Sequence, residues 1–351
     1  MSAATAERID TLGAVISVRR HRAVRAAVVT TALALVVFTL FVVTMMVGSF
    51  RLSAGEVLGS LLRTRVDPAV DFVVLDLRLP IAMSALAVGL ALGTAGTVFQ
   101  QLLRNPLAAP DIVGVSTGAS LAAVSSIVLF EATGLQICLA ALAGAVLGAL
   151  TIYLLTWRQG VNGYRFILVG IGISALFESG IGYLLTRADL RDAREAVHWL
   201  TGTVGRAGDR EQYALAVSLV VLLPVAVALR RQLRALEFGD DTARALGVRT
   251  ELARFALLAI SVVLVAGATA VAGPIAFVAL VAGPIANRLL GPATGGVIAA
   301  ALAGAALLLA ADLIATQLSP IALPTGVVTG ALGAPYLLWL IVSTNREGAG
   351  A

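Results

Sequence analysis

Few side chains in this sequence of 351 residues could carry out chemistry, and they are widely spaced. The two histidines, His21 and His198, lie far apart and belong to no recognisable set of metal ligands, so no metal or catalytic site is predicted. The single cysteine, Cys138, lies in an apolar run and is interpreted as a small buried hydrophobe. Every one of the 25 basic residues is arginine, and a phosphate-binding loop of the G-x-x-x-x-G-K-[ST] type needs a lysine. The sequence therefore does not predict ATP hydrolysis by this chain, or any other enzyme activity.

Two acidic residues, Glu178 and Asp312, stand inside long apolar segments. An acid at membrane depth is costly unless it is paired or faces water, which makes both residues candidates for lining a polar path. The alternative is a structural role, in which the carboxylate bonds to a hydroxyl or a backbone group. That alternative is favoured for Asp312, and both roles stay open for Glu178.

The composition places the chain in a lipid bilayer. Hydrophobic residues make up 59% and charged residues only 13%, and the mean hydropathy is +0.96, which excludes an ordinary water-soluble domain. Aromatics are only 5% and glycines number 35, which favours closely packed helices over a β-barrel. The net charge of +5 comes from arginines spread among short loops, so no nucleic-acid surface is predicted.

A scan for apolar segments of about 20 residues predicts an all-α integral membrane protein with about ten transmembrane helices. The segments lie near residues 23–47, 79–103, 112–130, 134–157, 164–186, 212–229, 252–272, 275–290, 295–317 and 325–343. The eighth is short and is broken by Pro274 and Pro284, so its boundaries are the hardest to predict.

The arginines predict the orientation. With ten spans both termini lie on one side, and that side collects sixteen of the 25 arginines against eight acids. Cytoplasmic loops are enriched in Lys and Arg, so this side is assigned to the cytoplasm and the protein to the inner (plasma) membrane. The predicted organisation is a cytoplasmic tail at 1–22, a permease domain at 23–343 and a second cytoplasmic tail at 344–351.

The inward loop contains an amphipathic segment, EFGDDTARALGV, at residues 237–248. Acids near a helix N-terminus interact favourably with the helix dipole, and Gly247 can end the helix in a left-handed cap. The segment is interpreted as a docking element for a partner, within a coupling region at about 236–249. A solvated connector is the alternative.

Several strings resemble the FecCD family of permeases, which take up ferric siderophores, haem and cobalamin. They occur in the family's order, from about residue 50 to the C-terminus: LRLP at 77–80, QLLRNPLAAPDIVGVSTGAS at 101–120, FGDDTARALGV at 238–248, VAGPIAFVAL at 271–280, LLLAADL at 307–313 and LPTGVVTGALGAPYLLWL at 323–340. The resemblance implies the permease fold of cobalamin and siderophore importers.

The resemblance also implies roles for particular residues. The residues implied to couple the permease to a partner ATPase are Gly239, Asp240, Asp241, Ala243, Arg244, Leu246 and Gly247. Docking of a binding protein falls on Arg78, and the mouth of the pathway on the helix that contains His198 and Trp199. A structural re-entry motif is formed by Arg104, Asn105, Pro106, Pro110 and Asp111, and Asp312 belongs to the family pattern.

The implied function is the permease subunit of an ABC importer for a ferric siderophore or a related chelate. ATP and Mg²⁺ are expected in two partner ATPase subunits and no cofactor in this chain, with an extracytoplasmic binding protein delivering substrate. The chain departs from the family pattern at Ile81, Gly283 and Thr316, and at 81 and 316 relatives can carry arginine. A paralogous second permease is therefore slightly favoured over a homodimer. The alternative function is an ion-coupled secondary transporter that uses Glu178 and Asp312.

Overall fold

The computed structural model describes residues 3–48, 50–64, 67–111, 114–157, 163–291, 296–318 and 322–348, and these residues form helices and connecting segments without a β-strand. Residues 1, 2 and 349–351 of the two predicted tails lie outside the described residues. The predicted all-α fold is confirmed, because a helix occupies each of the ten predicted positions. These helices are α1 (Ala3–Met46), α4 (Leu79–Leu103), α5 (Val115–Phe130), α6 (Leu135–Thr156), α7 (Gly163–Arg187), α9 (Asp209–Ala228), α12 (Thr250–Ala272), α13 (Val278–Leu290), α14 (Val297–Leu313) and α15 (Thr325–Gly348).

The remaining elements are short and lie between the long helices. They are α2 (Ala54–Leu61), α3 (Pro68–Asp71), the π-helical segments η1 (Phe72–Arg78) and η2 (Ile314–Leu318), α8 (Leu190–Leu200), α10 (Arg230–Glu237) and α11 (Asp240–Ala245). Seven of the described helical segments are long and apolar enough to cross a membrane by length and composition. Two more, α5 and α13, are apolar but have only 16 and 13 residues.

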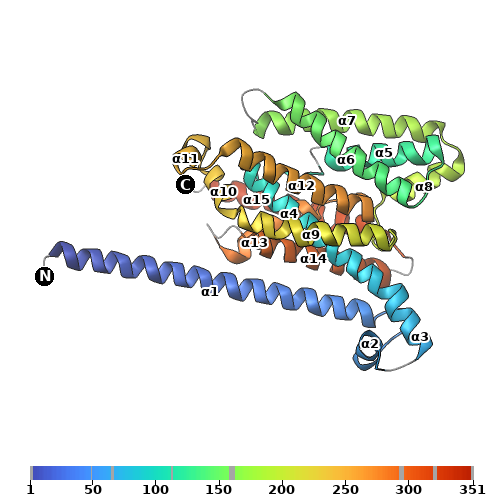
Figure 1. Cartoon of the computed structure of the whole chain (residues 1–351), viewed down its shortest axis with the longest axis horizontal. Coiled ribbons are helices and arrows are strands. Elements are labelled where there is room, and N and C mark those ends of the chain that lie inside the picture. Colours follow the sequence, from blue (N-terminus) through green and yellow to red (C-terminus); the bar gives the residue numbers. More distant parts are fainter. Residues whose placement is uncertain are drawn as a thin grey trace.

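The long helices run roughly alongside one another in three layers (Figure 1). α5, α6 and α7 form one outer layer, α4, α9 and α12 the middle, and α13, α14 and α1 the other side. In α12, 67% of the most apolar window is buried, whereas in α1 only 6% is, so α1 lies at the periphery against α14. The helix α4 packs against α12, α13 and α14 and forms the centre of the bundle.

Small residues allow this close packing. A Cβ on Gly93 would clash with the carbonyl oxygen of Ala300 on α14, and one on Gly144 would clash with that of Gly118 on α5. The spacing G-xxx-G, typical of close helix contacts, occurs at Gly89/Gly93, Gly144/Gly148 and Gly326/Gly330, and the first two pairs pack against a neighbouring helix as this spacing predicts. A Cβ on Gly330, by contrast, would meet open space within the chain.

At two places the helices differ in extent from the predicted segments. The segment 3–22 is helical and continuous with the first span, because nothing between Ala3 and Met46 breaks the helix. The eighth helix begins at Val278 and not at 275, because the chain around Pro274 is extended and Phe277 has a left-handed φ of 68°.

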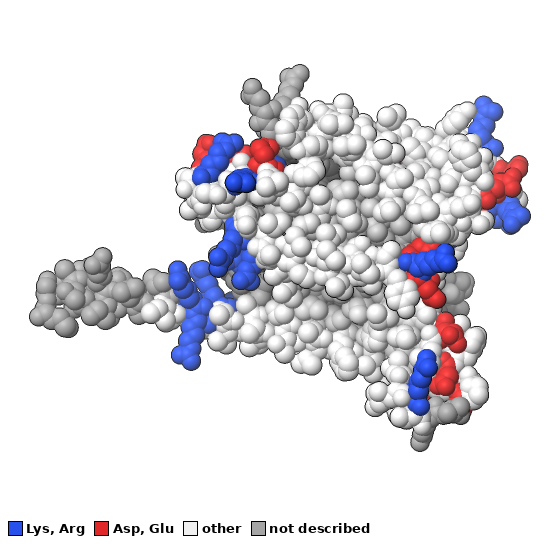
Figure 2. Space-filling model, viewed as in Figure 1, with Lys and Arg blue, Asp and Glu red and all other residues white. Residues whose placement is uncertain are grey.

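On the face seen in Figure 2, charged side chains lie at the two ends of the bundle, and the surface between them is almost entirely uncharged. At the end where α1 begins, arginines stand without acids on α1 and beside α10 and together with acids at α11, whereas the opposite end carries acids and arginines together. An uncharged band between two charged ends is what a bilayer requires of a multi-pass protein.

Candidate functional site

The coupling region, 236–249, contains the end of α10 and the whole of α11, which are separated by Phe238 and Gly239. Gly239 has φ +106° and Gly247 has φ +81°, conformations that L side chains rarely adopt. At the end of α11, the Val248 amide donates to the Ala243 carbonyl at 3.0 Å and the Gly247 amide to the Arg244 carbonyl at 2.9 Å. These two bonds form a Schellman cap, so the predicted left-handed end of the helix is present.

Asp240 ties the coupling segment to the transmembrane helices. Its Oδ1 lies 2.7 Å from an Nη of Arg254 in α12 and 3.4 Å from an Nη of Arg104 at the end of α4. The Arg104 Nε also donates to the carbonyl of Leu236 in α10 at 3.0 Å. The consecutive helices α11 and α12 therefore meet the distant end of α4 at one carboxylate, so that α11 is held rigidly on α4 and α12.

Other residues of α11 divide between a buried and an exposed face. Ala243 is fully buried and packs into the core cluster, so it anchors α11 and does not present a surface. Arg244 pairs with Asp241 at 3.1 Å on the outside, and both side chains are exposed. Phe238 and Leu246 are 73% and 66% exposed, which is unusual for apolar residues in a charged loop. The exposed surface of α11 and its two flanking turns thus combines two apolar side chains with an ion pair.

The re-entry motif forms a tight turn after α4. Arg104 ends the helix with φ 52°, and Asn105 Oδ1 accepts a hydrogen bond from the Leu107 amide at 2.9 Å. The buried amide of Gln100 donates to the carbonyl of Pro106 at 2.9 Å and to that of Leu280 in α13 at 2.8 Å. Gln100, which the sequence analysis did not single out, therefore fixes the turn against α13.

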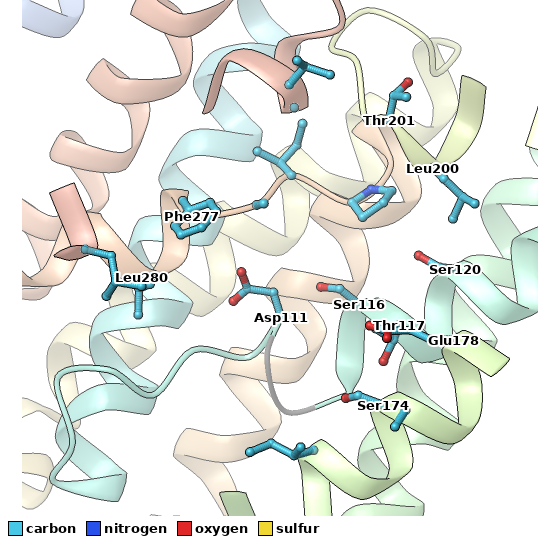
Figure 3. A pocket seen from close by; sticks show the side chains of 18 residues that line it. Asp111, Ser116, Thr117, Ser120, Ser174, Glu178, Leu200, Thr201, Phe277 and Leu280 are labelled. Atoms are coloured by element: carbon cyan, nitrogen blue, oxygen red, sulfur yellow. The ribbon is translucent and has the colours of Figure 1, made fainter. Parts of the chain in front are cut away.

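A cavity of about 750 Å³ lies between α5, α7 and the extended segment before α13 (Figure 3). One wall is polar, with Asp111 from the turn before α5 and side chains of α5 and α7: Ser116, Thr117, Ser120, Ser174 and Glu178. The other wall is apolar and contains Ile275, Phe277 and Leu280. Such a two-sided cavity can accommodate a large, weakly polar solute, with hydroxyls and carboxylates contacting its polar atoms.

The structure places the candidate pathway residues differently from one another. Glu178 lines the cavity from α7, and Asp111, predicted only as part of a structural motif, lines it as well. His198 is exposed and Trp199 is buried in the core, and neither is on the cavity wall; the next two residues, Leu200 and Thr201, are.

Comparisons with known proteins show the family of the chain. The model of the FecCD transport family matches residues 33–343. This chain belongs to the FecCD transport family. It is 42% identical over 301 residues to the ferric enterobactin transport system permease protein FepG of Escherichia coli K12, which covers 86% of this chain and 91% of that protein. It is 36% identical over 302 residues to the hemin transport system permease protein HmuU of Yersinia pestis, covering 83% and 89%.

A solved structure has the same fold. It is an inward-facing structure assigned to the metal-chelate type of ABC transporter, and it matches with a TM-score of 0.79 and 25% identity over 90% of this chain and 98% of that one. The family membership that the motifs suggested is thus confirmed, as is the multi-pass membrane fold.

In this FecCD family protein, Asp312 lies away from the cavity wall. It is 3% exposed, and its Oδ1 accepts a hydrogen bond from the Thr325 hydroxyl at 3.0 Å. This bond joins the end of α14 to the start of α15. The geometry corresponds to the structural role that the sequence analysis favoured.

Arg78 lies at the junction of η1 and α4, and its guanidinium points at the end of α1. It donates to the carbonyl of Met45 at 2.8 Å and to that of Phe50. Gly48 provides the space, because a Cβ there would clash with the guanidinium. The guanidinium that was expected to contact a binding protein is thus already hydrogen-bonded to backbone carbonyls at the end of α1 and in the α1–α2 connection.

Proposed function

We propose that the chain is a transmembrane permease subunit of an ABC importer that carries a ferric siderophore, or a related chelate such as haem or cobalamin. The observation that carries the proposal is the clamped α10–α11 element. It is fixed to α4 and α12 through Asp240 and yet exposes Phe238, Leu246 and Arg244. A rigid lever with an exposed apolar face fits a chain that takes its energy from a separate ATPase, since this sequence has no lysine for a phosphate-binding loop.

The proposed assembly contains a second permease, two ATPase subunits that bind ATP and Mg²⁺, and an extracytoplasmic binding protein. The coupling region faces the cytoplasm, as do both tails, at 1–22 and 344–351, and the membrane is the inner membrane. Arginine-rich α1 and α10 at the same end of the bundle support this orientation. ATP binding at the ATPases would move α11, and through Asp240 the ends of α4 and α12, so that the cavity opens alternately to the two sides.

A ferric siderophore is the substrate class favoured here. The relatives include permeases named for ferric enterobactin, achromobactin and hemin, at 36–42% identity. The cavity supports the proposal chemically, since a siderophore presents both amide or catecholate oxygens and apolar surface to its surroundings. The hydroxyl-rich wall and the apolar wall of the cavity match these two kinds of siderophore surface.

An ion-coupled mechanism loses its main support. It requires Glu178 and Asp312 to serve one path, but Glu178 lines the cavity whereas Asp312 is buried against Thr325 between α14 and α15. We therefore do not propose it.

Uptake into vesicles that contain the permease, its ATPase and its binding protein tests the proposal. Uptake of ⁵⁵Fe-siderophore should need ATP on the α11 side and should continue when proton and sodium gradients are collapsed. Uptake that follows an ion gradient without ATP would overturn it. A panel of a ferric catecholate, a ferric hydroxamate, haem and cobalamin, bound first to the partner binding protein, identifies the chelate.

A further inference from the structure

Five arginines from two helices surround hollows at one edge of the bundle. Arg22 and Arg25 of α1 line a hollow of about 450 Å³. A neighbouring hollow of about 330 Å³ is lined by three arginines of α10: Arg230, Arg231 and Arg234. The two hollows share Leu290 at the end of α13. We name this place the arginine groove.

The charge of the groove is not balanced within the described part of the chain. Neither hollow has an acid among the described residues of its wall. Arg22, Arg230 and Arg231 form no ion pair with a described residue, whereas Arg234 interacts with Glu237. Like charges gathered at one place repel one another, so an anionic partner would stabilise the groove.

The position of the groove relative to the hydrocarbon indicates which kind of anion binds there. The apolar part of α9 ends at Ala228, just before Arg230, and the apolar run of α1 starts at Ala26, just after Arg25. The arginines therefore stand where the spans leave the hydrocarbon, which is the level of lipid phosphates. Below them the wall is apolar, with Val227, Val297 and Ile298. A phosphate above and acyl chains below is the pattern of a phospholipid.

We propose that the arginine groove binds an anionic phospholipid, whose phosphate is held between α1 and α10 and whose acyl chains lie against α9 and α14. Helix α1 lies at the periphery of the bundle, with 6% of its apolar window buried. A lipid bridging Arg25 and Arg230 would join this helix to α10, the element that leads into α11. Basic pockets at helix ends commonly bind such head groups.

Native mass spectrometry of the full chain in detergent tests the proposal, with dioleoyl-phosphatidylglycerol as the probe and dioleoyl-phosphatidylcholine as the neutral comparison. The wild type should bind the anionic lipid about tenfold more tightly. The triple variant R230Q/R231Q/R234Q should lose most of this preference. The exposed arginines of the opposite end provide the matched control, R191Q/R194Q/R210Q, which removes the same charge and should keep the preference.

The variant R22Q/R25Q tests the groove from α1 independently, should the α10 variant fail to fold by circular dichroism. Equal binding of the two lipids, or equal losses in the groove and control variants, would overturn the proposal. Inorganic phosphate that binds as tightly as the phospholipid would also overturn it, because the groove would then be a site for a free anion. Loss of ATPase co-purification with unchanged lipid binding would assign the arginines to the protein partner instead.

Discussion

The carboxylate of Asp240 lies 2.7 Å from the guanidinium of Arg254, whose side chain is only 8% exposed. The two residues belong to different helices, α11 and α12, and Arg104 of α4 approaches the same oxygen at 3.4 Å. A buried arginine is costly without a partner, so Asp240 both neutralises Arg254 and fixes the position of α11. This pair is the mechanical link between the exposed coupling surface and the bundle.

Replacing Asp240 by asparagine should weaken that link. Charge-assisted hydrogen bonds contribute about 1.5–3 kcal/mol, so we expect faster amide exchange in α11 and a clear loss of substrate-stimulated ATP hydrolysis. The neighbouring substitution Asp241→Asn is the control, because Asp241 is fully exposed and pairs only with the exposed Arg244. Hydrogen exchange and hydrolysis that change equally in the two variants would show that the Asp240 pair does not carry the coupling.

Glu178→Gln should change which chelates pass. If its carboxylate faces the translocated solute, removing the negative charge favours anionic substrates, and an interaction of about 1 kcal/mol corresponds to about a fivefold change in the uptake ratio. We expect uptake of an anionic ferric catecholate to rise relative to a neutral ferric hydroxamate, with unchanged thermal stability. Glu131→Gln, at an exposed position outside the cavity, should leave the ratio unchanged. An unchanged ratio in Glu178→Gln would exclude this role.

Arg78→Gln distinguishes docking from a structural role. Because the guanidinium bonds to the carbonyls of Met45 and Phe50, the substitution should lower the melting temperature of the purified protein. Affinity for the binding protein should change by less than about fivefold, since an exposed ion pair is worth only about 0–1 kcal/mol. Arg191→Gln, exposed at the same end, controls for loss of charge. A large loss of affinity at full stability would restore the docking role inferred from family resemblance.

Thr325→Val should destabilise the junction of α14 and α15. The substitution keeps the shape but leaves the buried Asp312 carboxylate without the hydroxyl at 3.0 Å, at a cost of about 1–3 kcal/mol. Thr329→Val is the matched control, because that hydroxyl donates only to Gly326 in its own helix, at 2.9 Å. Equal melting temperatures in the two variants would show that the Asp312–Thr325 bond contributes nothing specific.

The sequence predicted the helices well because each span needs a long apolar run, which is a local property. It predicted the packing glycines only partly. Gly93 and Gly330 share the same spacing signal, yet the first meets α14 and the second meets open space. Spacing shows that a close approach is allowed, and the neighbouring helix decides whether it occurs.

The site was harder to predict because its contacts join distant parts of the chain. Asp111 and Glu178 reach one cavity only because the turn after α4 bends back, a turn fixed by Gln100. The pairing of Asp240 with Arg254 depends on the left-handed turn at Gly247. The one signal of this pairing in the sequence was Arg254, at the start of the predicted span 252–272, because a cation there needs a partner.

The last prediction concerns the second permease. The positions where relatives can carry arginine hold Ile81, which packs close to Gly205, and Thr316, whose hydroxyl donates to the Asp312 carbonyl at 2.8 Å. With Arg78 engaged by backbone carbonyls, two copies of this chain would offer few free cations at these positions, which would reduce the electrostatic steering of an acidic binding protein. A paralogous permease would restore the charge on one side. We therefore expect little uptake when this chain is expressed with its ATPase and binding protein alone, and several-fold more when the paralogue is added. Full uptake from the three-gene set, with a single permease species by mass spectrometry, would establish a homodimer and contradict this expectation.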